Sequence, residues 1–221
     1  MKCLSNKVKF IFSCEHASNK IPLKYNYLFK GKENIILSHR GYDIGVYEIA
    51  KKISSQLKTK FFYGKYSRLL IDLNRTLNNT KIFSEFTKTL TSKEQSIIID
   101  KYYLPYRNRV ENEISDLIKK KYMVIHFSFH SFTPVMNNKI RNLDIGLLYD
   151  PKRQTEKNIC SDLKKKFFQI NHKLIIKFNN PYRGISDRFT TYLRKKFQPS
   201  NYAGIEIEIN QKFFLNRNEK I

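Results

Sequence analysis

The sequence predicts an α/β protein: a three-layer sandwich around a mostly parallel, mixed central sheet. Short apolar runs alternate with longer stretches of helical spacing along the chain, and this alternation is typical of a sheet covered by helices. Several apolar runs end directly in polar residues, as parallel strands do where they carry a site at their carboxyl ends. The 221 residues contain no repeat and no linker rich in Pro, Gly or Ser, so we expect a single domain spanning 1–221.

The expected elements follow in order from these runs and from the turn and cap signals between them. Strands are expected at 8–13, 60–63, 69–73, 122–129, 144–149, 173–178 and 204–209. Helices are expected at 44–57, from a capping box at 91–94 to about residue 120, at 155–168 and at 186–197. Pro105 is expected to kink or split the second of these helices. Asp43 and Ser186 stand where N-caps would lie.

One expected strand, in the stretch YMVIHFSFHSFTP at 122–134, turns polar on one face only. His126, Ser128 and His130 are two residues apart, so they share a face in a strand. Phe127 and Phe129 point the other way. A polar end on a buried strand is where an α/β protein usually carries its chemistry. A core strand whose histidines satisfy neighbouring backbone groups would show the same pattern.

The chain is strongly basic, with a formal net charge of +23 from 42 Lys and Arg against 19 Asp and Glu. Such a charge attracts anions, including nucleic acid, acidic membranes and small carboxylates. The lysines are spread along the whole chain, however, and no RNA-binding aromatic signature accompanies them. We therefore attribute the charge to composition and expect no nucleic-acid partner.

The cysteines and the N-terminal segment bear on location. Cys3, Cys14 and Cys160 are odd in number and have no CxxC spacing, which favours free thiols in a reducing compartment. Residues 1–14 contain no apolar core of a signal peptide, and no segment approaches 18 apolar residues. We expect a cytoplasmic protein without a membrane partner.

Polar clusters that follow five apolar runs are candidates for a site. They are Glu15-His16, Asp72 with Asn74-Arg75, His130-Ser131, Asn180–Tyr182, and Glu208 with Asn210-Gln211. Parallel strands bring such ends to one edge of a sheet. Two histidines and a carboxylate there suit a zinc ion that keeps an open position for water. A separate carboxylate can serve as the base, and an arginine beside an asparagine can hold a substrate carboxylate.

Each of these candidates also has a simpler interpretation. Glu15 and Arg75 could be solvated surface residues, and Asp43 could be only a helix cap. Glu206 and Glu208 lie on one face of an expected strand and could be the solvent-facing side of a sheet edge. The pattern alone does not decide between these interpretations.

Seven motifs, taken together, resemble the N-formylglutamate amidohydrolase family over about residues 8 to 214. They are SCEHASNKIP at 13–22, YDIGVYEIA at 42–50, SRLLIDLNR at 67–75, HFSFHSFTP at 126–134, RNLDIGLLYDP at 141–151, NNPYRG at 179–184 and YAGIEIEINQ at 202–211. The family is similar to zinc carboxypeptidases and aspartoacylases. The resemblance implies a phosphorylase/hydrolase-like fold and hydrolysis of an amide next to a carboxylate with one zinc ion.

The resemblance also implies a zinc site. His16 in EHAS and His130 in FHSF match the family's zinc-binding histidines. The wider superfamily has a glutamate three residues after the first histidine, where this chain has Asn19, a poor zinc ligand. Asp43 in YDIG is the candidate for the missing carboxylate, with Glu15 as the next choice.

Further roles follow from the same comparison. Glu208 in EIEINQ matches the general base, and Asn74-Arg75 in DLNR matches the pair that holds the substrate carboxylate. Arg68, which could instead pair with Asp72, and Tyr182 are further candidates for substrate binding. The comparison leaves a supporting or core role to His126, and wall positions of the pocket to Ser131 and Thr133.

The sequence and the resemblance together predict a cytoplasmic, zinc-dependent amidohydrolase. Its expected cofactor is one Zn²⁺ per chain, and its expected substrate is a small anionic N-acyl amino acid of the N-formyl type. Two alternatives remain: a hydrolase of another N-acyl amino acid or small peptide, and a metal-free anion- or RNA-binding protein on the same fold. Nothing in the sequence indicates the oligomeric state.

Overall fold

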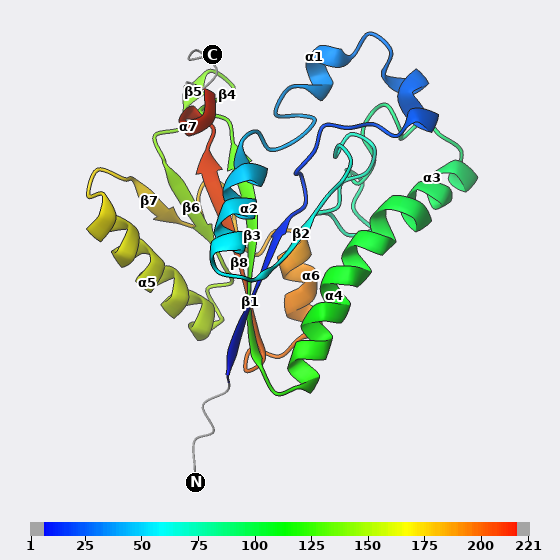
Figure 1. Ribbon diagram of the computed structural model, residues 1–221. Helices are drawn as coiled ribbons and strands as arrows, with labels where there is room; N and C mark the ends of the chain where they lie inside the picture. The colour runs from blue at the N-terminus through cyan, green and yellow to red at the C-terminus, as the bar shows by residue number, and fades with distance from the viewer. Residues whose placement is uncertain (1–6, 216–221) are drawn as a thin grey trace.

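The computed structural model describes residues 7–215, in which a six-stranded sheet runs in the order β2-β1-β3-β8-β6-β7 (Figure 1). Its strands are β1 (Val8–Cys14), β2 (Lys60–Tyr63), β3 (Met123–Phe132), β6 (Ile145–Leu148), β7 (Ile176–Phe178) and β8 (Tyr202–Asn210). Strands β2, β1, β3 and β8 are parallel to one another, whereas β6 runs antiparallel to β8 and parallel to β7. This confirms the predicted mixed, mostly parallel sheet. A separate two-stranded hairpin joins β4 (Val135–Met136) to β5 (Lys139–Ile140).

Helices cover both faces of the sheet and so complete the predicted three layers (Figure 1). On one face lie α2 (Val46–Gln56) and α5 (Gln154–Ile170), and on the other lie α4 (Leu104–Lys119) and α6 (Phe189–Lys196). Short elements complete the chain: η1 (Leu23–Phe29), α1 (Glu33–Ile36), α3 (Ser92–Ile98), the π-helical turn η2 (Ile99–Tyr103) and α7 (Lys212–Leu215). The loops around η1 and α1, blue in Figure 1, gather beyond the carboxyl ends of the parallel strands.

The alternation predicted for β3 is present. Phe127 and Phe129 pack into the apolar cluster beneath α2 and α5. Val124 packs into the cluster beneath α4 and α6, and His126 lies on the same face, where its ring faces Phe189 of α6. The polar face of β3 is therefore buried, so any charge on it must be satisfied within the protein.

Several sequence-based boundaries were wrong. Residues 69–73 are not a strand but a buried irregular segment. Their apolar side chains pack into the core below α4, so the run reflects burial and not strand pairing. Helix α2 begins after Gly45, which has φ +75°, and not after Asp43. Helix α6 begins after Arg188 instead of Ser186, because the Asn74 side chain accepts a hydrogen bond from the Phe189 N–H at 2.8 Å.

Two other local predictions are confirmed. Thr91 and Glu94 form the capping box of α3, in which each side chain bonds the backbone of the other. The helical region is split before Pro105 by η2, and Pro105 lies in the first turn of α4, where its missing N–H costs least.

Two findings bear on the expected location. Cys14 and Cys160 are buried free thiols, while Cys3 lies outside the described residues. Among residues 7–215, no helix combines the length and the apolar character needed to cross a bilayer.

Candidate metal centre

Two loops and the end of one strand bring His16, Asp43 and His130 together. We call these three residues the metal-centre cluster. His16 follows β1, Asp43 precedes α2, and His130 lies near the end of β3. One potential ligand atom from each residue lies within 4.8 Å of the others. The Asp43 Oδ2 atom lies 2.9 Å from His130 Nδ1 and 3.5 Å from His16 Nδ1. All three residues are buried, and the Asp43 backbone N–H donates to the His16 carbonyl at 2.9 Å, which joins the two loops.

The outer nitrogen of each histidine faces a second carboxylate. His16 Nε2 lies 2.7 Å from Asp72 Oδ1, and His130 Nε2 lies 3.2 Å from Glu15 Oε2. Such pairs hold the proton on the outer nitrogen, and this leaves the lone pair of the inner nitrogen for a cation. Both inner atoms are Nδ1, and both face Asp43.

His16 Nδ1 provides a direct test of whether a metal fits. Within the described part of the chain it is a buried nitrogen without a hydrogen-bond partner. Buried polar atoms are rarely left unsatisfied. A divalent cation between His16, Asp43 and His130 would satisfy it, and two imidazoles with one carboxylate are a ligand set that leaves a position open for a reactant. The arrangement therefore fits a metal ion.

The charge around the cluster is negative. Burial alone would raise the pKa of Asp43, but Arg68 and the two histidines hold it well below its usual value. The pKa values of Glu15 and Asp72 are likewise lowered against the effect of burial, mainly by His130 for Glu15 and by His16 for Asp72. Three ionised carboxylates thus surround two histidines and one arginine. When both imidazoles are neutral, as metal ligands are, this excess of carboxylates favours a bound cation.

His130 responds to the same environment. Burial alone would lower the pKa of its imidazole, but hydrogen bonds to Asp43 and Glu15 raise it well above the usual value. Without a metal ion, a proton on the His130 ring would neutralise part of the negative charge of Asp43 and Glu15. The binding of a divalent cation would have to displace that proton.

Glu206 and Glu208, on the adjacent strand, differ in their surroundings. Glu208 pairs with His130 in the β3–β8 ladder. Both glutamates are buried, because β8 lies between β3 and β6 and is not an edge strand. This excludes the interpretation of their strand as a solvent-facing sheet edge. Arg188 Nη1 donates to Glu206 Oε2 at 2.5 Å and to Glu208 Oε1 at 3.2 Å.

These contacts separate the two carboxyl groups by basicity. Burial would raise the pKa of Glu206, but Arg188, with help from the Thr190 hydroxyl, lowers it. Burial raises the pKa of Glu208, and the more distant contact with Arg188 only partly offsets this. Glu208 is therefore the better proton acceptor of the two.

A cavity of about 140 Å³, which we call the site cavity, joins these groups. It is lined by the eight residues assigned from the motifs to metal binding, catalysis or substrate binding: His16, Asp43, Arg68, Asn74, Arg75, His130, Tyr182 and Glu208. Asp72, Ser131 and Arg188 complete its lining. Asn19 borders other hollows of the surface, and Thr133 is not part of the lining. Among the candidates for the third metal ligand, Asp43 is therefore the one that the structure groups with both histidines.

The three arginines of the site cavity are held to different extents. Arg68 pairs with Asp43, and not with Asp72 as the sequence had allowed. Arg188 is held by two glutamates and lies over the Tyr182 ring, with its guanidinium carbon 4.9 Å from the ring centre. Arg75 donates to the Asp187 carbonyl at 2.8 Å, and its Nε lies 3.9 Å from Asp72 Oδ2. Arg75 is thus the arginine least neutralised by carboxylates.

Sequence reasoning missed some roles at this site. The contact of Arg188 with two strand glutamates had no signal, because an arginine just before a helix is usually solvated. The pairing of Asp72 and Glu15 with the histidines was also missed. Both acids belong to the polar clusters that follow apolar runs, and Glu15 was the next choice for the missing metal ligand. Their place beside the candidate ligands is the signal that could have found these pairings.

His126 has a different environment from His130, although the two share a strand face. Its ring nitrogens lie 2.8 Å from the Ser13 hydroxyl and 2.8 Å from the Tyr202 hydroxyl. Burial lowers the pKa of His126 to about 4. It is a neutral histidine of the core, below the cavity and outside its lining.

The fold and the site define a class: an α/β protein with a candidate metal-dependent hydrolytic site at the carboxyl edge of its sheet. The model of the N-formylglutamate amidohydrolase family matches residues 8–215, and the chain belongs to this family. The resemblance seen in the motifs is confirmed. Membership makes the protein a hydrolase that acts on amides.

Two solved structures are similar over most of the chain. The gene product Atu2144 from Agrobacterium tumefaciens shares 26% identity at a TM-score of 0.79, covering 97% of this chain and 84% of that chain. An N-formylglutamate amidohydrolase from Ralstonia eutropha JMP134 shares 16% identity at a TM-score of 0.70, covering 95% and 83%. The second likeness supports the fold only. No curated protein sequence matches significantly.

Proposed function

We propose that the protein is a zinc-dependent amidohydrolase that cleaves the amide of a small N-acyl acidic amino acid, of the N-formyl type, in the cytoplasm. The observation that carries this proposal is the metal-centre cluster. Two inner imidazole nitrogens and one carboxylate face each other, and each imidazole is oriented by an outer carboxylate. Within residues 7–215, one of these inner nitrogens has no hydrogen-bond partner. Family membership supplies the amide as the bond to be cleaved.

His16, Asp43 and His130 would hold one zinc ion per chain. When bound there, zinc would polarise the amide carbonyl and lower the pKa of a water molecule to about 7. Three protein ligands leave a fourth position free, which is the arrangement of catalytic zinc sites and not of structural ones.

Glu208 would act as the general base. It would take a proton from the attacking water and deliver it to the nitrogen that leaves. Burial raises its pKa, which makes it a stronger base than an exposed glutamate. Arg188 Nη1 donates to Glu208 Oε1 at 3.2 Å, and this bond limits the rotation of the Glu208 carboxylate.

Arg75 would anchor the substrate carboxylate, because it is the arginine of the site cavity least neutralised by acids. Arg68 and Tyr182 would form the walls around it. Asn74 is already engaged, since its oxygen accepts from Phe189 and its nitrogen lies 3.3 Å from His130 Nε2. Its proposed contribution is to hold the segment that presents Arg75. The cavity of about 140 Å³ is below the usual 300–1,000 Å³ of drug-sized ligand sites, which supports a short acyl group.

The test of this proposal is a panel of N-formyl, N-acetyl and longer N-acyl derivatives of glutamate, aspartate and leucine, assayed with zinc and after chelation. We expect zinc-dependent release of the free amino acid, fastest for a formylated acidic one. Comparable turnover after full metal removal would refute zinc dependence. A preference for another acyl group would change the substrate and leave the mechanism in place.

Two variants separate the roles of base and anchor. Glu208→Gln should abolish turnover while zinc still binds at 1:1, and loss of zinc would instead make Glu208 a ligand. Arg75→Ala should weaken only those substrates that carry the free carboxylate, and an equal loss on the matching amides would argue against an anchor. His172→Ala changes an exposed residue that does not line the site cavity, and it serves as the control for both variants.

A further inference from the structure

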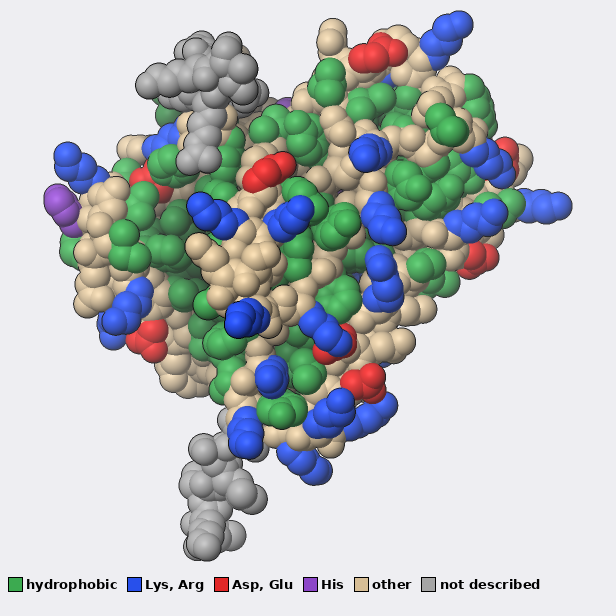
Figure 2. All heavy atoms as spheres, in the orientation of Figure 1, with side chains coloured by type: hydrophobic (Ala, Val, Ile, Leu, Met, Phe, Trp, Pro, Cys, Tyr) green, Lys and Arg blue, Asp and Glu red, His purple; other side chains and the backbone are tan. Residues whose placement is uncertain are grey.

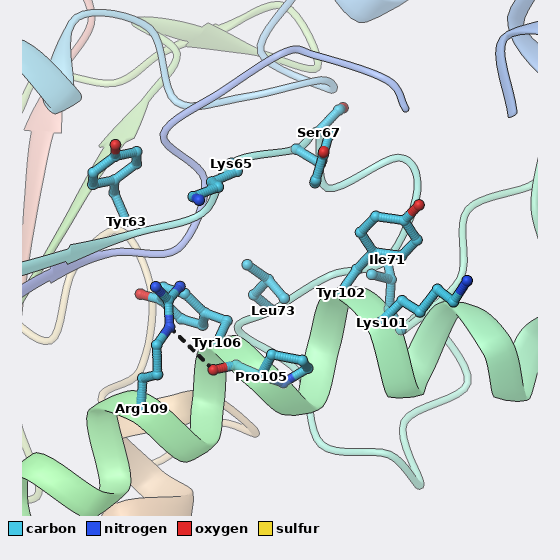
Figure 3. Close-up of a pocket in the computed structure, with 11 residues that line it drawn as sticks. Tyr63, Lys65, Ser67, Ile71, Leu73, Lys101, Tyr102, Pro105, Tyr106 and Arg109 are labelled. Atoms are coloured by element: carbon cyan, nitrogen blue, oxygen red, sulfur yellow. Dashed lines mark hydrogen bonds between the residues drawn. The ribbon is translucent and has the colours of Figure 1, made fainter. Parts of the chain in front are cut away.

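Figure 3 shows a second cavity, larger than the site cavity and lined in part by Ile71 and Leu73. Its volume is about 410 Å³, within the range of small-molecule sites. It shares no lining residue with the site cavity. We call it the tyrosine cavity, because Tyr63, Tyr66, Tyr102 and Tyr106 are part of its lining.

The tyrosine cavity has an apolar floor and an aromatic wall. Ile71, Leu73 and Tyr106 are almost fully buried and form the floor. The rings of Tyr66 and Tyr102 meet edge to face, with their centres 5.1 Å apart. Such a surface accepts the flat face of another ring, and aromatic pairs contribute about 0.5–1.5 kcal/mol beyond area burial.

The charged residues of this cavity are all cations. Lys65, Lys101 and Arg109 are exposed at its rim, and the lining contains no acidic residue. Within the described chain, none of the three forms an ion pair with a carboxylate, and Arg109 Nε donates only to the Pro105 carbonyl, at 3.2 Å. Figure 2 shows cations scattered among apolar and neutral groups over the visible face. What sets these three apart is the aromatic hollow that they border, whose lining contains no acidic residue.

We propose that the tyrosine cavity is a second binding site, for a small aromatic anion: a ring that carries a phosphate or a carboxylate. The ring lies on the tyrosines and the apolar floor, and the anionic group meets the cations of the rim, of which Lys65 and Arg109 lie on the side of Tyr63 and Tyr106 and Lys101 lies beside Tyr102 (Figure 3). Neither part alone uses the site fully. An inorganic anion leaves the floor empty, and an uncharged ring leaves the cations without a partner.

The tyrosine cavity borders the groups that orient both histidines of the metal centre. Along the segment 71–74, Ile71 and Leu73 line the tyrosine cavity, while Asp72 and Asn74 line the site cavity. Asp72 is the outer partner of His16. A ligand that presses on Ile71 or Leu73 therefore acts on the backbone that places Asp72.

Tyr106 provides a second connection. Its ring lines the tyrosine cavity and its hydroxyl donates to Glu15 Oε1 at 2.8 Å. The other oxygen of Glu15 faces His130 Nε2. Occupancy of the tyrosine cavity should therefore change the affinity of the metal centre for zinc, and zinc should change the affinity for the aromatic anion by the same factor. This coupling, unlike the binding itself, rests on the proposed metal centre.

Calorimetric titration of the metal-free protein with phenyl phosphate and with benzoate tests the binding. We expect phenyl phosphate to bind at least tenfold more tightly than inorganic phosphate or benzyl alcohol, and benzoate shows whether a carboxylate suffices. The combined variant Lys65→Gln, Lys101→Gln, Arg109→Gln should weaken binding at least tenfold. The matched control Lys152→Gln, Lys157→Gln, Lys166→Gln removes the same charge from exposed positions around α5 and should stay within twofold of the wild type.

Two outcomes would overturn the proposed site. Equal losses in the two triple variants would mean that the probe follows only the general positive charge. Binding that survives the cavity variant but is lost in Arg75→Ala would place the probe in the site cavity. Either result leaves the proposed amidohydrolase function standing, because no step of this titration involves turnover.

The coupling is tested by titrating phenyl phosphate into zinc-loaded and metal-free protein. We expect affinities that differ at least threefold, with the difference removed in the cavity variant. Equal affinities would refute the coupling. A difference that persists in the cavity variant would mean direct binding at the metal and would refute it as well.

Discussion

Two clusters of buried charge lie at opposite ends of β8, and they are built in opposite ways. Near the start of the strand, Glu156 and Arg194 form an ion pair in which every carboxylate oxygen and guanidinium nitrogen has a partner. Glu156 accepts from Arg194 Nε, from the Gly204 N–H and from the Asp150 N–H, all within 3.0 Å. The remaining nitrogens of Arg194 donate to the carbonyls of Gly184 and Gly204.

Near the end of the same strand, the metal-centre cluster is left open. Three carboxylates surround His16 and His130, and His16 Nδ1 has no hydrogen-bond partner within residues 7–215. Both clusters are largely buried, so burial of charge does not by itself mark a functional site. What distinguishes the metal-centre cluster is unmatched negative charge and an unsatisfied lone pair, which only a ligand would complete.

The largest effect is expected from a variant that breaks the ion pair between Glu156 and Arg194. Glu156→Gln leaves Arg194 buried without its countercharge, and removing one partner of a buried pair costs about 3–5 kcal/mol. We expect urea denaturation to show a loss of that size in the free energy of unfolding. Zinc should still bind at 1:1 to the folded protein, because Glu156 is outside the site cavity. Loss of zinc by the folded variant would contradict the separation of the two clusters.

The next largest effect is expected when the Asp43 carboxylate of the metal-centre cluster is removed. If zinc binding of roughly 10–16 kcal/mol is divided over about four coordination positions, Asp43→Asn should cost roughly 2.5–4 kcal/mol, or about 60- to 900-fold in affinity. Calorimetric titration with zinc measures this directly. Asp116→Asn, at an exposed carboxylate of α4, should bind zinc as the wild type does. Wild-type affinity in Asp43→Asn would remove Asp43 from the ligand set.

The pH dependence of stability distinguishes His126 from His130, which lies on the same strand face. Both ring nitrogens of His126 have hydrogen-bond partners in the core. Its pKa in the folded protein is about 4 against 6.5 for the unfolded chain, so the unfolded state binds the proton more tightly. The stabilising contribution is complete above pH 6.5 and is lost as pH falls from 6.5 to about 4, for a total of about 3 kcal/mol. In His126→Gln this part of the pH dependence of unfolding should disappear, and an unchanged slope would show that other groups cause it.

The smallest of these effects concerns an outer partner. Asp72→Asn keeps the size of the side chain and removes the charge that orients His16. Outer carboxylates of this kind usually contribute 10- to 100-fold in metal affinity, so we expect a loss in that range with 1:1 binding retained. A loss as large as that of Asp43→Asn would mean that Asp72 is itself a ligand.

Some of the site could be predicted from the sequence because polar residues follow apolar runs. His16 comes directly after β1, and His130 and Glu208 lie near the ends of neighbouring parallel strands, so one sheet edge brings them together. The edge-strand interpretation of Glu208 failed for a related reason. Alternation shows which residues share a face, but only the order of strands shows whether that face is buried.

The sequence by itself determined the alternation of strands and helices, the polar face of β3 and the strand-end positions of His16, His130 and Glu208. Periodicity and strand-end polarity are local properties of the chain, so they can be recognised before folding is known. Only the tertiary structure decided that Asp43 faces both histidines, that Asp72 and Glu15 orient them, and that Arg188 reaches Glu206 and Glu208. These contacts join residues from 18 positions apart (Arg188 and Glu206) to 115 positions apart (Glu15 and His130), and no local pattern encodes where a loop packs.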